Sequence, residues 1–369
     1  MKIHRYGRLT GVALLGALAL TACGSDNNSG STAGGSGSSS ASCPSGTIAA
    51  EGSTAQKNAI EQVVTAYQDQ CSGVTINYNP TGSGAGVKQF IAGQVDFAGS
   101  DSALSTEAKD GVVEQDAADK TCGSPAWNLP MVVGPIAVAY NVKGLDKLVL
   151  TPDVTAKIFN GVITKWNDPA IKALNSGASL PSTAIKVFFR SDESGTTQNF
   201  TKYLNAAAPK AWPAAPAKVW SGKGEGKPKS DGVSAAVKST DGGIAYVEWS
   251  YAQQNSLGIA QIDNGGGPVE LTAENVGKAI EAAQVVGTGN DLKMKIDYTT
   301  KAAGAYPIDL VTYEIVCSKA KDAAKGKAVK AFLTYFASTA TQSTLTKVGS
   351  APLPASVQAK VAAAVAALS

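Results

Sequence analysis

Three short turns of the sequence place hydroxyl and glycine residues where a helix is expected to begin. They read GSTAQ at 52–56, TGSGAG at 81–86 and SGTT at 194–197. The first N–H groups of a helix have no intrahelical partner and the helix dipole is positive there, so an anion meets several donors. Ser and Thr are also ordinary N-caps, so each turn alone is equally consistent with a simple helix start.

Charged residues accompany these turns. Arg190 directly follows an expected strand just before the third turn, and Asp101 follows the apolar strand of VDFAGSD at 95–101. An acid at the carboxyl end of a strand faces the usual ligand crevice of an open α/β sheet, although Asp is also a common turn residue. Together the set offers several donors and one acceptor, which suits a small anion that still carries a proton: Thr54, Ser83, Asp101, Arg190 and the turn at Ser194.

Other site classes do not fit these residues. The second turn imitates a dinucleotide fingerprint, but Val87 stands where its third glycine is needed. The sequence has neither a P-loop ending nor a GxSxG elbow. His4 is the only histidine and belongs to an expected leader, so we expect no Ser-His-Asp triad, no His metal ligand, no metal and no cofactor.

The amino-terminal region is typical of an exported lipoprotein. Lys2, Arg5 and Arg8 precede an apolar stretch at 9–20 that is too short to span a bilayer. The sequence LTACG at 20–24 resembles a lipobox, so we predict a signal peptide at 1–22 and a lipid on Cys23; the alternative is an ordinary signal peptide with a stray cysteine. The Ser- and Gly-rich remainder of 23–45 is expected to be a flexible tether.

Charge and cysteine content agree with export. Loss of 1–22 removes three of the 32 Lys and Arg and leaves 29 basic against 29 acidic residues, so no basic face for nucleic acid is implied. Four cysteines remain after Cys23, and an even number in an oxidising compartment indicates two disulfides. Among three possible pairings we favour Cys43–Cys71 and Cys122–Cys317, because Cys43 and Cys71 precede the first two strands of one βαβ unit.

The elements expected around these residues alternate between strand and helix. The body at 46–369 exceeds what one core usually covers, so two α/β domains are predicted. Expected strands are 47–50, 74–78, 95–98, 129–133, 136–140, 186–189, 243–247, 258–262 and 308–316. Expected helices are 55–70, 85–93, 153–159, 195–206, 232–239, 248–255, 322–337 and 340–347, followed by packing residues Val357, Val361, Val365 and Leu368 at helical spacing. Lys223, Lys227 and Lys229 with their glycines indicate a mobile surface loop.

Ordered motifs along the whole body resemble one family. They are GSTAQ, GSGAGVKQFIAGQVDFAGSD, FNGVITKWNDPAI, FRSDESGTTQNFTKYL, GIAYVEWSYAQQNSLG and YPIDLVTYEIV. The chain resembles the phosphate-binding proteins of bacterial high-affinity phosphate ABC transporters, of the actinobacterial lipoprotein type. The resemblance implies a type II periplasmic-binding fold with two hinge crossings and a ligand cleft, in which 46–133 plus 306–369 form domain I and 134–305 form domain II.

The resemblance also assigns roles to residues of this sequence. It implies that phosphate is bound by Thr54, Ala55 through its backbone, Ser83, Asp101, Arg190, Ser194, Gly195 and Thr196, with Asp192 orienting Arg190. Asp101 is expected to accept the phosphate proton. Two positions depart from the family pattern: Ala55 replaces an aromatic residue, and Glu193 replaces a glycine and is expected to point to solvent.

The implied function is capture of phosphate outside the cytoplasm for import. The expected protein is a monomer, not an enzyme, held by its lipid on the outer face of the cell membrane, with ABC permease subunits as partners and no nucleic acid. Two alternatives stay open from the residues: a lipid-anchored phosphate sensor or adhesin, and a phosphatase on the same scaffold, which the missing histidines make hard to build.

Overall fold

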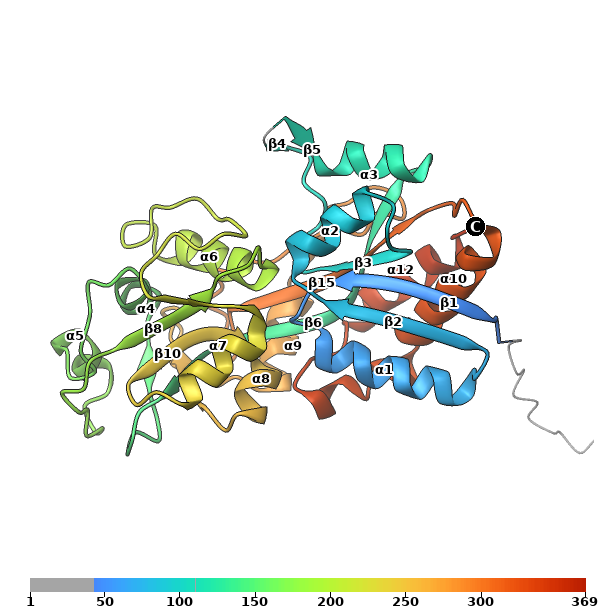
Figure 1. The fold of residues 1–369 in the computed structure, drawn as a ribbon. Coiled ribbons are helices and arrows are strands. Elements are labelled where there is room, and N and C mark those ends of the chain that lie inside the picture. The colour runs from blue at the N-terminus through green and yellow to red at the C-terminus, as the bar shows by residue number, and fades with distance from the viewer. Residues whose placement is uncertain (1–42, 110) are drawn as a thin grey trace, which may run out of the picture. The chain divides into compact units, whose positions relative to one another are not determined.

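A strand of 16 residues, β6 (Ala126–Asn141), organises the main sheet of the computed structural model, which describes residues 43–109 and 111–369 (Figure 1). Its first part pairs antiparallel with β15 (Asp309–Cys317) and its last part with β10 (Gly243–Glu248). The expectation of two separate strands here is wrong. Pro135 pairs with Asp309, the first residue of β15, at the point where β6 changes its partner strand. The missing N–H of Pro135 therefore does not interrupt β6.

Two groups of parallel strands flank the β15–β6 pair. The main path of the sheet has the order β2-β1-β3-β15-β6-β10-β8-β9, and β11 (Gly258–Ile259) pairs with β6 off this path. The other strands of the path are β1 (Gly46–Gly52), β2 (Val74–Pro80), β3 (Phe97–Ser100), β8 (Lys186–Arg190) and β9 (Glu225–Lys227). In the first group β1 is parallel to β2 and β3, and in the second β8 is parallel to β9 and β10. Residues that follow parallel strands gather at one edge of a sheet, which places the turns after β1 and β3 together.

Each strand group has its own helices (Figure 1). The first packs with α1 (Lys57–Gln70), α2 (Ser83–Ile91), α3 (Glu114–Cys122), α10 (Ala323–Ala337) and α12 (Ala355–Ala366). The second packs with α4 (Pro152–Phe159), α6 (Gly195–Ala207), α7 (Lys229–Lys238) and α8 (Trp249–Gln254). The four predicted packing residues of the C-terminal helix are buried, which confirms that prediction.

Several short elements complete the chain. They are β4 (Ala108–Lys109), β5 (Val112–Val113), β7 (Val149–Leu150), α5 (Pro169–Leu174), β11 (Gly258–Ile259), β12 (Gln261–Ile262), α9 (Ala273–Glu281), β13 (Gln284–Val285), β14 (Met294–Lys295), α11 (Thr339–Gln342) and the 3-10 turn η1 (Leu345–Val348). The predicted strand at 258–262 divides because β11 pairs with β6 and β12 with β7. The predicted helix at 340–347 divides into α11 and η1.

Sequence patterns missed elements that bury little apolar surface. Helix α3 buries only Ala118 and Cys122, so its apolar period is too weak to identify. The segment of Lys223, Lys227 and Lys229 was also misjudged. It supplies edge strand β9, parallel to β8, and the start of α7, so the prediction of a mobile loop is wrong.

The structure contains both disulfides that the sequence analysis favoured, Cys43–Cys71 and Cys122–Cys317. The second closes a sequence separation of 195 residues and joins the end of α3 to the end of β15. Ser318 N donates to Pro125 O beside this disulfide, so the two chain segments are also held by the backbone. Within 43–109 and 111–369, no helix combines the length and the apolar character needed to cross a membrane.

Candidate functional site

The turn after β1 places Ser53, Thr54 and Ala55 at the edge of the sheet. Helix α1 begins at Lys57, two residues later than predicted. The residues before it form a tight turn, in which Ala55 N donates to Ser53 Oγ at 3.0 Å. Ser53 Oγ in turn donates to Asp101 Oδ1. Thr54 Oγ1 lies 2.8 Å from Ser230 Oγ of α7, so the turn contacts both strand groups.

Asp101 follows β3 and is the acceptor at the centre of the site. Its Oδ1 accepts from Ser53 and from Thr312 Oγ1 of β15, the latter at 2.8 Å, and its Oδ2 accepts from Ser83 Oγ at 2.9 Å. A carboxylate offers about four acceptor positions, so the three hydrogen bonds leave one position on Oδ2. Asp101 is 3% exposed, and the remaining position suits one protonated ligand oxygen.

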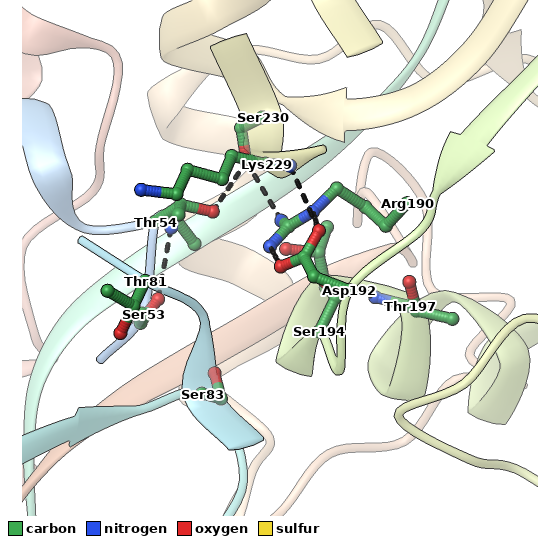
Figure 2. A network of polar contacts seen from close by, with 12 residues as sticks. Ser53, Thr54, Thr81, Ser83, Arg190, Asp192, Ser194, Thr197, Lys229 and Ser230 are labelled. Carbon is green, nitrogen blue, oxygen red and sulfur yellow. Dashed lines mark hydrogen bonds and ion pairs between the residues drawn. The ribbon is translucent and has the colours of Figure 1, made fainter. Parts of the chain in front are cut away.

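Arg190, at the end of β8, is held by two partners (Figure 2). Its Nε and Nη2 form a bidentate ion pair with Asp192, and its Nη1 donates to Ser230 Oγ at 3.1 Å. Lys229 N donates to Asp192 Oδ1 at 2.9 Å and has a φ of 58°. A lysine in this left-handed region is strained, and the strained turn brings Ser230 between Arg190 and Thr54.

Helix α6 begins at this point with the predicted third turn. Ser194 is its N-cap and its Oγ accepts from Thr197 N at 3.1 Å, so the N–H groups of Gly195 and Thr196 are left at the helix start without an intrahelical acceptor. Gly195 is required by close approach. A Cβ there would lie 2.5 Å from both Ser83 Oγ and the Asp101 Cβ, so any side chain would displace the site residues.

Burial sets the electrostatics of the charged residues. Burial raises the pKa of Asp101 to about 6, against the opposing effect of the Ser53, Thr312 and Ser83 hydroxyls and with a contribution from Glu248. Burial alone would lower the pKa of Arg190, but the hydrogen bonds and charge of Asp192 raise it above its ordinary value. The same pair lowers the pKa of Asp192 despite its partial burial. Arg190 is therefore a permanent cation whose charge Asp192 already balances.

The structure brings the predicted site residues together. Thr54, Ser83 and Asp101 come from the β1 group, and Arg190, Ser194, Gly195 and Thr196 from the β8 group, with Asp192 on Arg190 as expected. Cys23 lies outside the described residues. The arrangement of one free acceptor position, one guanidinium and two free helix N–H groups can bind a tetrahedral oxyanion that carries a proton.

Sequence reasoning missed four site side chains. Ser53 was recognised only as a helix start, and Ser230, Glu248 and Thr312 were not assigned. Ser230 had a signal, since PKSDG at 228–232 places a hydroxyl at the start of a helix. Thr312 and Glu248 had none, because they lie inside buried strands whose patterns predict only packing.

Glu193, which was predicted to point to solvent, is only partly exposed because it pairs with a surface lysine. Its Oε2 forms an ion pair with Lys88 Nζ of α2 at 2.7 Å, and its backbone O accepts from Gly84 N at 3.1 Å. The side chain keeps 33% exposure, so it lies at the rim of the site. The negative charge of Glu193 is thus neutralised locally by Lys88.

Glu314 of β15 makes the stability of the protein pH-dependent. Burial raises its pKa from 4.5 to about 8, against the opposing effect of a hydrogen bond from the neighbouring Gln56 and with a contribution from the charge of Asp101. The folded form therefore binds more protons than the unfolded form between these values, so the free energy of unfolding should fall as pH rises from 4.5 to about 8.

Glu314→Gln should reduce this loss. A pKa shift is equivalent to about 1.4 kcal/mol per unit, and the buried amide gives up part of that gain, so we expect about 2 kcal/mol of added stability near pH 9. Near pH 4, where Glu314 is neutral, the cost of the buried amide remains without that gain, so the variant should be about 3 kcal/mol less stable than the parent. Denaturant unfolding at both pH values measures the difference, with Glu107→Gln on the exposed surface as the control. Equal effects at both pH values would contradict the assignment.

Comparisons with known proteins agree on one family. A family model described as a PBP superfamily domain matches residues 37–340. The chain is 49% identical over 375 residues to the phosphate-binding protein PstS2 of Mycobacterium bovis (strain BCG / Pasteur 1173P2), with 100% of both chains covered. It is 47% identical over 373 residues to the phosphate-binding protein PstS 3 of Mycobacterium tuberculosis (strain ATCC 25618 / H37Rv), with 99% of each covered.

A solved structure has the same fold. It is a high affinity periplasmic phosphate-binding protein bound with phosphate at pH 8.5, with a TM-score of 0.70 and 24% sequence identity, and the match covers 86% of this chain and 93% of that one. The predicted α/β fold of the periplasmic-binding type is therefore confirmed.

Proposed function

The chain belongs to the PstS family of phosphate-binding proteins in the PBP superfamily, and on that premise we propose that it captures inorganic phosphate outside the cytoplasm and delivers it to an ABC permease for import. The observation that carries the proposal is the single free acceptor position on Asp101, enclosed by hydrogen-bond donors. Hydrogen phosphate needs one acceptor for its proton and donors for its other oxygens.

Each predicted residue has a role in this proposal. Asp101 accepts the phosphate proton, and Arg190, oriented by Asp192, supplies the charge-assisted hydrogen bonds. The N–H groups of Gly195 and Thr196 and the hydroxyls of Thr54, Ser83 and Ser194 surround the remaining oxygens. Ala55 contributes its N–H after Ser53 Oγ releases it. Ser230 holds Thr54 and Arg190 at a fixed separation.

Two domains would form the walls of the site. We assign 46–133 with 306–369 to domain I and 134–305 to domain II. The exchange of neighbours along β6 at Pro135 and the start of β15 at Asp309 support these boundaries, because both lie within a few residues of them. Thr54, Ser83 and Asp101 then belong to domain I, and Arg190 and the α6 start to domain II, so phosphate would lie between the domains.

We assign the protein to the outer face of the cell membrane, as a monomer held by a lipid on Cys23. The leader and tether in the sequence support this placement. Metabolic labelling with a palmitate analogue tests it: Cys23→Ala should abolish the label and release the protein from the membrane fraction. Recovery of label in that variant would refute the anchor.

Calorimetry of phosphate-stripped protein against phosphate, sulfate and arsenate tests the proposed function. We expect tight binding of phosphate and far weaker binding of sulfate, because sulfate has no proton to give Asp101. No heat with phosphate, or equal affinity for sulfate, would overturn it. Restored phosphate uptake in a strain that lacks the gene would distinguish transport from sensing. We expect no phosphate release from a chromogenic ester, which separates binding from phosphatase activity.

A further inference from the structure

Another buried carboxylate, Glu248, contacts Thr196 of the proposed site. It ends β10 and lies at the N-cap of α8, yet its side chain makes no cap hydrogen bond to that helix. Its Oε1 accepts instead from Thr196 Oγ1, and its Oε2 has no partner among the described residues. Glu248 is 1% exposed, so half of an ionisable group is buried without a hydrogen bond.

The charges around Glu248 do not balance. The negative charge of Glu248 acts on Asp101 after β3, Arg190 of β8 and Tyr251 of α8, and Asp192 lies behind Arg190. The bidentate pair makes Arg190 and Asp192 neutral together, which leaves three buried carboxylates: Asp101, Glu248 and Glu314 of β15, which is coupled to Asp101. A phosphate dianion would bring further negative charge into the same volume, and buried uncompensated charge is costly.

The hydroxyl of Thr196 cannot donate a hydrogen bond to Glu248 and to a ligand at the same time. A hydroxyl has one hydrogen, and Thr196 donates it to Glu248, so Thr196 offers a ligand only lone pairs from its side chain. A proton on Glu248 would reverse this direction. The carboxylic acid would donate to Thr196 Oγ1, and the Thr196 hydrogen would turn to a phosphate oxygen.

We propose that Glu248 takes up one proton from solvent when phosphate binds and, through Thr196, presents it as a hydrogen-bond donor to the anion. The inference rests on the proposed function. No bond to phosphorus forms or breaks: one proton leaves the solvent and stays on the Glu248 carboxylate, while the phosphate keeps its own proton for Asp101. Glu248 is therefore a positioning residue that makes binding proton-linked.

Calorimetry at alkaline pH, where free phosphate is the dianion, tests the proposal with inorganic phosphate. Titrations in two buffers of different ionisation enthalpy count the protons taken up. We expect about one proton per phosphate for the parent protein, and a Kd that rises about tenfold per pH unit over the same range. Glu248→Gln should take up nearly none, because a neutral amide replaces the acid. Thr196→Ser, which keeps the hydroxyl, should retain the uptake.

Asp309→Asn is the matched control, since Asp309 is a buried carboxylate of β15 whose side-chain oxygens have no hydrogen bond, to the site or elsewhere, among the described residues. It should retain the uptake. Absence of proton uptake in the parent protein would overturn the inference. Proton uptake that persists in Glu248→Gln, or that is lost in Glu314→Gln but not in Glu248→Gln, would overturn it too. A Kd of the parent protein that does not change with pH would also overturn the inference. Absence of phosphate binding would instead overturn the proposed function.

Discussion

Asp101→Asn is expected to remove most of the preference for phosphate over sulfate. The two anions have nearly the same size and charge near neutral pH, so donors cannot distinguish them, and only the proton differs. An ionised Asp101 accepts from a protonated phosphate oxygen but presents lone pairs to a bare sulfate oxygen. Sites built on such hydrogen-bond matching discriminate by roughly 10⁴ to 10⁵.

The structure predicts how the amide will lie. Ser53 and Thr312 both donate to Oδ1, so the amide oxygen must occupy that position and the NH₂ group must occupy the position of Oδ2. The NH₂ then donates to Ser83 Oγ with one hydrogen and to the ligand with the other. The acceptor position becomes a donor, which favours sulfate, while the fold is kept.

Competition titrations with phosphate and sulfate measure the ratio, with Asp309→Asn as the control for a buried carboxylate outside the site. Because the pKa of Asp101 is about 6, the parent protein should lose sulfate exclusion as pH falls through that value, when Asp101 becomes a donor. If Asp101→Asn still excludes sulfate as strictly as the parent protein, another residue must accept the hydrogen bond from protonated phosphate, and Asp192 is the first residue to test.

Arg190→Ala should weaken phosphate binding far more than Ser83→Ala. Arg190 is 3% exposed, and its loss leaves the Asp192 carboxylate without its cation next to an incoming anion. Truncating one partner of a buried charge pair costs about 2 to 5 kcal/mol, or roughly 30-fold to several thousand-fold in Kd. Ser83→Ala removes a hydrogen bond from an uncharged hydroxyl to a carboxylate and leaves no buried cation or anion without its ion-pair partner, which costs about 1.5 kcal/mol, or roughly 12-fold.

Titration of both variants and of the double variant Arg190→Ala/Asp192→Ala separates the two contributions. Removing Asp192 as well should recover part of the lost affinity, because the repulsive carboxylate is gone, but not the hydrogen bonds from the guanidinium. Equal losses for Arg190→Ala and Ser83→Ala would contradict the ranking. A double variant no better than Arg190→Ala would show that Asp192 repulsion contributes nothing.

Local sequence determined the parts of the site that depend on neighbours in the chain. Ser83 and Ser194 were found because a strand followed by a glycine and a hydroxyl predicts a helix start. Asp101 and Arg190 were found because the ends of parallel strands meet at one edge. Signals of this kind span only a few residues, so they can be recognised without knowledge of the fold.

Only the tertiary structure decided which side chains form hydrogen bonds and ion pairs with one another. Thr312 reaches Asp101 across 211 residues of sequence, and Ser230 reaches Thr54 across 176. Glu248 lies in a strand whose pattern indicates packing alone, and Glu193 meets Lys88 only because α2 and α6 begin side by side. Hydrogen bonds and ion pairs depend on the distance and direction between atoms, and a sequence orders residues along the chain without stating which distant ones will meet.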